Sequence, residues 1–185
     1  MHFHVASVLD LPEGWSNNFD LVHQRFLMGA LRVDDWRVGL SELLRVLKPG
    51  GTVQLVENIY CRPSESGTSQ RFYDLFDAFF NSLGLSQRIA IELPTLLESA
   101  GFVEVSWEDK VVLNGNGKEW GEDAARAAAI HFIGMRSLAQ SVVAAGFVGS
   151  VSEYEQMMSD LEKEWEEKGE RVTARIICAR KPSKL

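Results

Sequence analysis

The chain has 185 residues, 45% of them hydrophobic, which is enough to bury one sizeable core, so a single domain over residues 1–185 is expected. Its formal net charge of −7 and its scattered 19 Lys and Arg residues argue against nucleic acid and anionic membranes as partners. Cys61 and Cys178 lack the spacing of zinc ligands. The chain shows neither a run of 18 apolar residues nor a secretory signal, so a soluble cytoplasmic protein is expected.

The first third of the chain predicts two strands, a helix and a further strand. Residues 2–6 and 19–23 are short apolar runs of the kind found in strands. Apolar side chains then recur at helical spacing on one face, at Trp36, Leu40, Leu43, Leu44 and Leu47. Residues 48–51, Lys-Pro-Gly-Gly, stop that helix, and residues 52–57 read as a parallel strand covered on both faces. Strand, helix and strand make one βαβ unit.

An aromatic helix and a long strand are expected next. The apolar positions of this helix share one face, which must bury itself or bind an apolar ligand, at Phe72, Phe76, Phe79, Phe80 and Leu83. Pro94 is expected in the first turn of a short helix that Gly101 ends. Residues 102–112 then predict a strand.

The last third predicts helices followed by a closing strand. Residues 119–145 are alanine-rich and helical, with Gly134 as a weak point. Residues 152–155, Ser-Glu-Tyr-Glu, match a capping box that opens a helix to about Lys168. Apolar residues alternate over 172–178, as in a strand.

Several of these segments resemble class I S-adenosylmethionine-dependent methyltransferases. The resemblance rests on Phe19-Asp20-Leu21-Val22, on the helix that ends in Lys48-Pro49-Gly50-Gly51, and on the strand through Glu57. The run from Val22 to Met28, with Trp36, looks most like the fungal secondary-metabolism branch and its regulator-like relatives. Further matches at residues 100–102, 152–168 and 179–182 extend the resemblance over nearly the whole chain.

The resemblance implies an α/β, truncated Rossmann-like methyltransferase fold. The family sheet has the strand order 3-2-1-4-5-7-6, and this chain would supply strands 3 to 7, with a helical insertion or lid at residues 114–170 between strands 6 and 7. The first two strand-helix units would be missing, and with them the glycine-rich cofactor loop and the acid that holds the ribose. At most half of an S-adenosylmethionine site is then expected from this chain.

The site residues follow from the positions that match the family. Ser7 falls where an aspartate commonly meets the adenine amino group, and His23 follows the strand edge where ligands collect in α/β sheets. The residues expected to bind the cofactor are Ser7, Asp10, Leu11, His23, Gln24 and Arg25. The ordinary alternative for the residues around His23 is hydrogen bonding to neighbouring loops.

His23 and Glu57 are the candidate catalytic residues, since a neutral histidine can remove a proton from an acceptor and an acid can orient a substrate. A cap or salt bridge is the alternative role for Glu57. The candidate substrate pocket consists of Phe26, Tyr60, Phe72 and Phe76. No metal is expected, because nothing near His2 and His4 completes a ligand set.

Two functions are open. One is a methyltransferase acting on a small secondary metabolite, incomplete for cofactor binding alone. The other is a cofactor-free relative that serves as a partner subunit or as a scaffold for small-molecule cyclisation. In both, the free edge of the fourth family strand must be covered, and a homodimer or a partner chain is expected there. By analogy with the regulator-like relatives, a nuclear location is the alternative to the cytoplasm.

Overall fold

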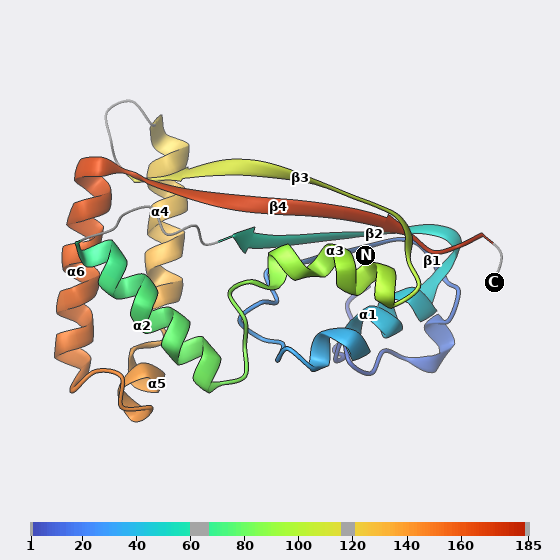
Figure 1. Ribbon diagram of the computed structural model, residues 1–185, viewed down its shortest axis with the longest axis horizontal. Coiled ribbons are helices and arrows are strands. Elements are labelled where there is room, and N and C mark those ends of the chain that lie inside the picture. The colour runs from blue at the N-terminus through green and yellow to red at the C-terminus, as the bar shows by residue number, and fades with distance from the viewer. Residues whose placement is uncertain (1, 60–66, 116–120, 184–185) are drawn as a thin grey trace. The chain divides into compact units, whose positions relative to one another are not determined.

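The computed structural model describes residues 2–59, 67–115 and 121–183, and the chain divides into two compact units. Unit 1 comprises Met1–Ile59, Gly84–Lys110 and Ala174–Leu185, and unit 2 comprises Tyr60–Leu83 and Val111–Thr173. The elements in chain order (Figure 1) are η1 (Glu13–Trp15), β1 (Phe19–Arg25), α1 (Asp35–Val46), β2 (Leu47–Ile59), α2 (Thr68–Ser82), α3 (Ile89–Ser99), β3 (Val103–Asn114), α4 (Gly121–Arg136), α5 (Ala139–Ala144), α6 (Val151–Lys168) and β4 (Glu170–Arg180).

The expected βαβ unit is formed by β1, α1 and β2. The two strands are parallel, with Val22 opposite Val53 and His23 opposite Gln54. β2 begins earlier than expected, at Leu47, directly after α1 ends. The carboxyl ends of β1 and β2 therefore lie at the same edge of the sheet, which is the arrangement on which the site prediction depends.

β4 lies between β2 and β3 in a four-stranded sheet of order β1-β2-β4-β3. Lys181 N donates to Gly51 O at 2.9 Å, and Gln54 Nε2 donates to Cys178 Sγ at 3.7 Å, so β4 runs antiparallel to β2. The ion pairs Asp109–Arg175 and Glu104–Arg180 give the same opposite direction for β3 and β4. A four-stranded sheet combined with helices confirms the mixed α/β fold class, and α4, α5 and α6 lie between β3 and β4 in the chain.

The sheet of unit 1 is covered by helices on one face. Alternate residues of β2 from Gly51 to Ile59 are buried, and α1 and α3 both pack against this strand from the same side (Figure 1). The residues between them, from Thr52 to Asn58, are half-buried. Among the described residues of unit 1 no helix lies over that second face, so the expectation of a strand covered on both faces is wrong here.

Two local predictions for unit 1 are corrected. Residues 2–6 form no strand, and the side chains of Phe3 and Val5 are 85% and 107% exposed, because no apolar surface receives them. α3 begins at Ile89, so Pro94 lies inside the helix rather than in its first turn. The buried face of Ile89, Leu93 and Leu97 offsets the backbone hydrogen bond that proline removes.

Unit 2 is a helical assembly around its own hydrophobic core. α2, α4 and α5 each pack against α6. The aromatic face of α2 is part of this core, as are residues from the other helices: Phe72, Phe76, Phe79, Phe132, Met135, Val142, Tyr154, Met158, Leu161 and Trp165. The expected helix over 119–145 is broken after Arg136, and α5 starts at Ala139.

The capping box of α6 lies two residues earlier than expected. Ser150 Oγ, not Ser152, accepts a hydrogen bond from Glu153 N at 3.1 Å. The Glu153 carboxylate in turn accepts from Gly149 N at 2.8 Å. The same Ser-x-x-Glu chemistry fits both registers in the sequence, and the helix takes the one that places Tyr154 and Met158 in the core.

Residues 121–144 have the length and the apolar composition of a membrane span. They do not form one continuous helix, because the chain leaves the helical conformation between α4 and α5. Arg136 at the end of α4 pairs with Glu155 and Glu162 of α6. Phe132 and Met135, on the same helix, are buried in the core of unit 2.

Candidate functional site

The chain turns sharply where β1 ends. Phe26 has a left-handed φ of 57°, and its backbone N–H donates to Val56 O at 2.9 Å. A non-glycine residue in this conformation costs about 1 to 3 kcal/mol, so other contacts must hold it. Leu27 O accepts from Ala30 N and Leu31 N at 2.9 and 3.0 Å, which fixes the turn that follows.

Glu57, near the end of β2, binds the backbone of this turn. One carboxylate oxygen accepts from Leu27 N at 2.7 Å and the other from Met28 N at 3.3 Å. The residue is 0% exposed. Burial raises the pKa of Glu57 to about 7, although the two amides favour its charged form. Both oxygens are therefore used inside the protein.

His23 has a different environment on the open face of the sheet. Its Nδ1 lies 3.0 Å from Gln54 Oε1, and Gln54 Nε2 donates to Cys178 Sγ. Since an amide oxygen only accepts, Nδ1 carries the proton in this pair and Nε2 is left with a free lone pair. His23 is exposed, so that lone pair is available to a ligand.

The structure separates the two candidate catalytic residues. His23 is opposite Gln54, on the open face, whereas Glu57 follows the alternating buried positions of β2 on the helix-covered face. Gln24 shares the covered face with Leu55, and its Nε2 is buried with no hydrogen-bond partner in the described chain. Arg25 returns to the open face, with its guanidinium 6.0 Å from the centre of the Phe26 ring.

The predicted adenine-side segment is bound to α1. Leu11 N donates to Glu42 Oε2 at 2.8 Å, and Leu11 O accepts from Arg45 Nη2 at 2.8 Å. Ser7 Oγ accepts from Leu9 N at 3.2 Å, whereas Asp10 is exposed. The N–H of Leu11 is therefore used, its carbonyl already accepts one hydrogen bond, and Asp10 offers the exposed carboxylate of residues 7–12.

Of the predicted aromatic pocket, Phe72 and Phe76 belong to unit 2, whereas Phe26 belongs to unit 1. Phe72 and Phe76 are 2% and 7% exposed and pack in the core of unit 2, so their apolar stripe is explained by burial. Phe26 is 50% exposed in the turn after β1. Tyr60, the fourth residue of that prediction, lies outside the described residues.

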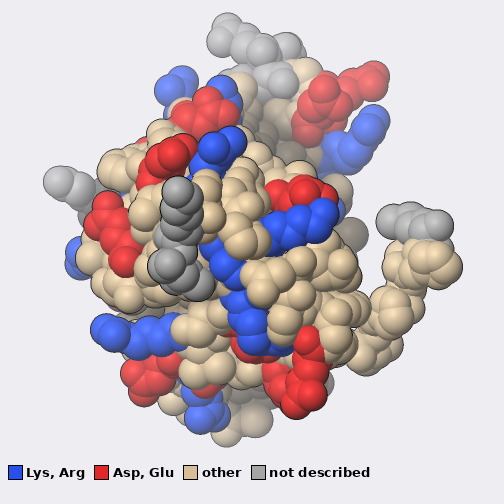
Figure 2. Space-filling view, turned by 90° about the vertical axis from the view of Figure 1, so that its right-hand side faces the viewer, with Lys and Arg blue, Asp and Glu red and all other residues tan. Residues whose placement is uncertain are grey.

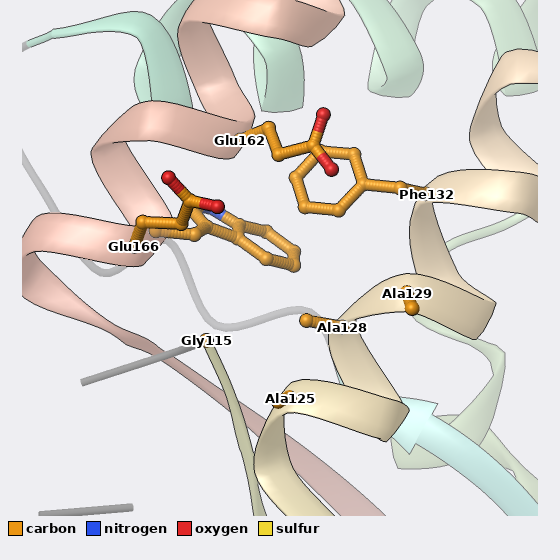
Figure 3. Close-up of a pocket in the computed structure, with 8 residues that line it drawn as sticks. Gly115, Ala125, Ala128, Ala129, Phe132, Glu162 and Glu166 are labelled. Atoms are coloured by element: carbon orange, nitrogen blue, oxygen red, sulfur yellow. The ribbon is translucent and has the colours of Figure 1, made fainter. Parts of the chain in front are cut away.

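Unit 2 contains a cavity of about 170 Å³ between α4 and α6 that sequence reasoning missed (Figure 3). Ala125, Ala128 and Ala129 line one side because their short side chains leave space unfilled, and Phe132 borders them. Glu162 and Glu166 project from α6 toward the same space (Figure 3). Glu162 is bound by Arg136 at 2.8 Å, which offsets its charge. The alanine run predicted a helix, and nothing in it signalled a cavity.

Charges of both signs are interspersed on the face of the molecule in Figure 2. Among the described residues, no group of three or more His, Cys, Asp or Glu side chains is placed to hold a metal ion. Gln54 is the residue near His23 that the sequence prediction overlooked. The feature of the sequence that could have indicated it is that Gln54 is a single polar side chain within the apolar run of β2.

Comparisons with known proteins confirm the resemblance to fungal methyltransferases. The N-methyltransferase sirN of Leptosphaeria maculans is 27% identical over 187 residues, which cover 98% of this chain and 66% of sirN. The N-methyltransferase verN of Clonostachys rogersoniana is 31% identical over 132 residues, which cover 71% of this chain and 43% of verN. The chain thus spans less than two thirds of the length of these relatives. No family model matches it.

Among solved structures, the cyclase SpnF is similar at 25% sequence identity with a TM-score of 0.47. The superposition covers 97% of this chain and 55% of SpnF.

Proposed function

We propose that this chain, a relative of the fungal secondary-metabolism N-methyltransferases, takes part in S-adenosylmethionine-dependent methylation of a small-molecule acceptor. The observation that carries the proposal is the alignment with sirN over 98% of the chain. The names of sirN and verN support a nitrogen as the accepting atom. The parallel β1–β2 pair, which brings the ends of both strands to one edge, is consistent with such a site.

His23 is the residue proposed to handle the proton of the acceptor. Gln54 holds Nδ1 in its protonated form, and Gln54 is itself oriented by Cys178. Nε2 can therefore take the proton that the acceptor loses, and the imidazolium that results remains bonded to Gln54 Oε1 through Nδ1–H. Gln54 keeps its hydrogen bond in both states of the ring.

The residues of this chain fit only part of the cofactor. His23, Arg25 and Asp10 have exposed polar groups, but the Leu11 main chain is used by α1 and Gln24 faces the covered side of the sheet. S-adenosylmethionine would supply the methyl group, and we propose that a completing polypeptide supplies the glycine-rich loop, which no segment of residues 1–185 matches. We also propose residues 114–170 as a helical insertion or lid of the complete site.

The cofactor proposal predicts weak binding by this chain alone. Titration calorimetry with S-adenosylmethionine is expected to give a dissociation constant no tighter than about 1 mM, equivalent to about −4 kcal/mol, because half of the contacts are missing. His23→Ala should lower methyl transfer in a mixture that contains the completing polypeptide, whereas His4→Ala serves as the control at an exposed histidine. Equal transfer by both variants would contradict the role of His23.

The second candidate function is that of a cofactor-free partner or cyclase scaffold, and the open edge of β1 favours the partner form. β1 is the terminal strand of the sheet, and the side chain of Leu21 is 60% exposed on it. An unpaired strand edge without a lysine or proline is a template for another strand. We propose that a second copy of the chain or a partner chain covers it.

Light scattering tests the dimer. The wild-type chain is expected to have twice its monomer mass at concentrations of about 100 μM, and Leu21→Lys should return it to the monomer, since charge on an edge strand blocks pairing. Val38→Lys is the matched control, because Val38 is 49% exposed and belongs to helix α1 rather than to a strand. A wild-type monomer at this concentration would remove the homodimer, as would a dimer that Leu21→Lys leaves intact.

A further inference from the structure

The Glu57 carboxylate is bound in a way that leaves it no role at a substrate. It is 0% exposed, and each of its oxygens accepts a backbone N–H, from Leu27 at 2.7 Å and from Met28 at 3.3 Å. A group that exchanges protons with a ligand must come within hydrogen-bond reach of it. Glu57 reaches only the turn after β1.

The backbone N–H groups of that turn are arranged to bind an anion. Phe26 is left-handed at a φ of 57°, and the next two N–H groups converge on one carboxylate. Successive backbone N–H groups around a left-handed residue form a concave anion site, called a nest. Here the chain supplies its own anion, from the neighbouring parallel strand.

The turn and the end of β1 carry the side chains that surround His23, where the acceptor is proposed to bind. Arg25 and His23 lie on the open face, and the exposed Phe26 ring lies 6.0 Å from the Arg25 guanidinium. Glu57 is on the opposite face, so it acts on them through the backbone of residues 26–28.

We propose that Glu57 is a positioning residue: its ionised carboxylate holds residues 26–28 in the nest conformation and so fixes Arg25 and Phe26 beside His23. A role for this positioning in methyl transfer rests on the proposed function. The hydrogen bonds from Leu27 N and Met28 N to the Glu57 carboxylate can be measured without any catalysis. A protonated carboxyl keeps fewer acceptor positions, so protonation weakens one of the two contacts.

Other charged groups do not explain the state of Glu57. The elements packed on this face of β2 carry Asp35, Arg37, Glu42 and Arg45 on α1 and Glu92 and Glu98 on α3. Glu42 and Arg45 bind each other, and Arg37, Glu92 and Glu98 are exposed. Arg25 lies on the far face of the sheet. None of these groups contributes to the pKa shift of Glu57, which burial and the two amides set.

The test follows the amide protons of Leu27 and Met28 by NMR from pH 5 to 9. In the wild-type chain both signals are expected to shift together, with a midpoint near the pKa of about 7, and their protection from exchange should be stronger above it. In Glu57→Gln the titration should vanish, and protection of one amide should fall about tenfold or more, as expected for losing a hydrogen bond to a charged group.

Glu170→Gln is the matched control, since Glu170 is also buried, with a pKa raised to about 7, but lies in unit 2. It should leave both amides unchanged. Signals that do not titrate between pH 5 and 9, or that titrate equally in Glu57→Gln, would overturn the proposal. If Glu57→Gln does not fold, the wild-type titration decides alone. If the amides titrate but the chain supports no methyl transfer even when mixed with the completing polypeptide, the positioning contact would be upheld and the proposed function would be contradicted.

Discussion

Trp165→Ala is expected to lower the free energy of unfolding of unit 2 by about 3 to 5 kcal/mol, as large-to-small aromatic replacements in cores do. Trp165 is 1% exposed, and its ring packs 5.0 Å from that of Phe132 and 5.3 Å from that of His131. Trp165 and the alanines of α4 already line a cavity of about 170 Å³, so removing the indole would enlarge an existing empty space. Chemical denaturation followed by circular dichroism gives the measurement.

Two variants serve as controls for Trp165→Ala. Trp165→Phe should cost much less than Trp165→Ala, since it keeps an aromatic ring and removes an indole N–H that is buried without a partner among the described residues. Trp107→Ala should cost about 1 kcal/mol at most, because Trp107 is 54% exposed and contacts the Arg175 guanidinium at 5.5 Å. A loss for Trp165→Ala as small as that for Trp107→Ala would show that α6 does not anchor the core.

The stability of the protein should fall as pH rises from about 5 to 7. Burial raises the pKa of Glu57 and of Glu170 from 4.5 to about 7, whereas it lowers the pKa of His131 from 6.5 to about 4. The two carboxyl groups outweigh the one imidazole, so on balance the folded chain binds more protons than the unfolded chain in this interval. At about 1.4 kcal/mol for each pKa unit, Glu57 alone accounts for up to roughly 3 kcal/mol. The stabilisation is fully present below the unfolded pKa and is lost as pH passes through the folded one.

Urea denaturation at half-unit steps of pH measures this slope. Glu57→Gln should remove the part that Glu57 contributes, whereas Glu166→Gln, at an exposed position of α6, should leave the slope as it is. A wild-type profile that is flat between pH 5 and 7 would contradict the prediction. So would a slope that Glu57→Gln leaves unchanged.

Global stability and the turn after β1 respond to pH in opposite directions. Above pH 7 the fold carries the cost of a buried charge at Glu57, while the ionised carboxylate holds Leu27 and Met28 most firmly. Raising the pH is therefore expected to lower the free energy of unfolding of the whole chain and to strengthen the hydrogen bonds that hold the turn after β1. Natural proteins commonly accept such local costs where geometry at a site matters.

The sequence predicted the βαβ unit because several independent signals agreed there. The apolar face of α1, the stop at residues 48–51 and the apolar run of β2 each indicate the same arrangement. The order of the remaining strands came from the family resemblance rather than from any local pattern. Periodicity fixes which residues share a face, but it does not say which strands are neighbours.

The site was predicted less well, because it depends on register and on long-range contacts. His23 and Glu57 both follow apolar strand residues in the sequence, and only the pairing of His23 with Gln54 shows that they occupy opposite faces. The burial of Glu57 depends on main-chain donors at Leu27 and Met28, about 30 residues away, which have no sequence signature. The aromatic face of α2 could be part of a core or of a ligand pocket, and only its long-range contacts show that it belongs to the core of unit 2.

The central place of β4 has a consequence for synthesis of the chain on the ribosome. A nascent polypeptide that has emerged only as far as α6 has β2 and β3 but not the strand that joins them, so two inner edges face water until translation has passed residue 180. Such edges invite wrong pairing with other chains. Lys181, which follows β4, then binds Asn17 Oδ1 and Leu47 O through its ammonium group, and so ties the end of β4 to the start of β2 and to the segment before β1.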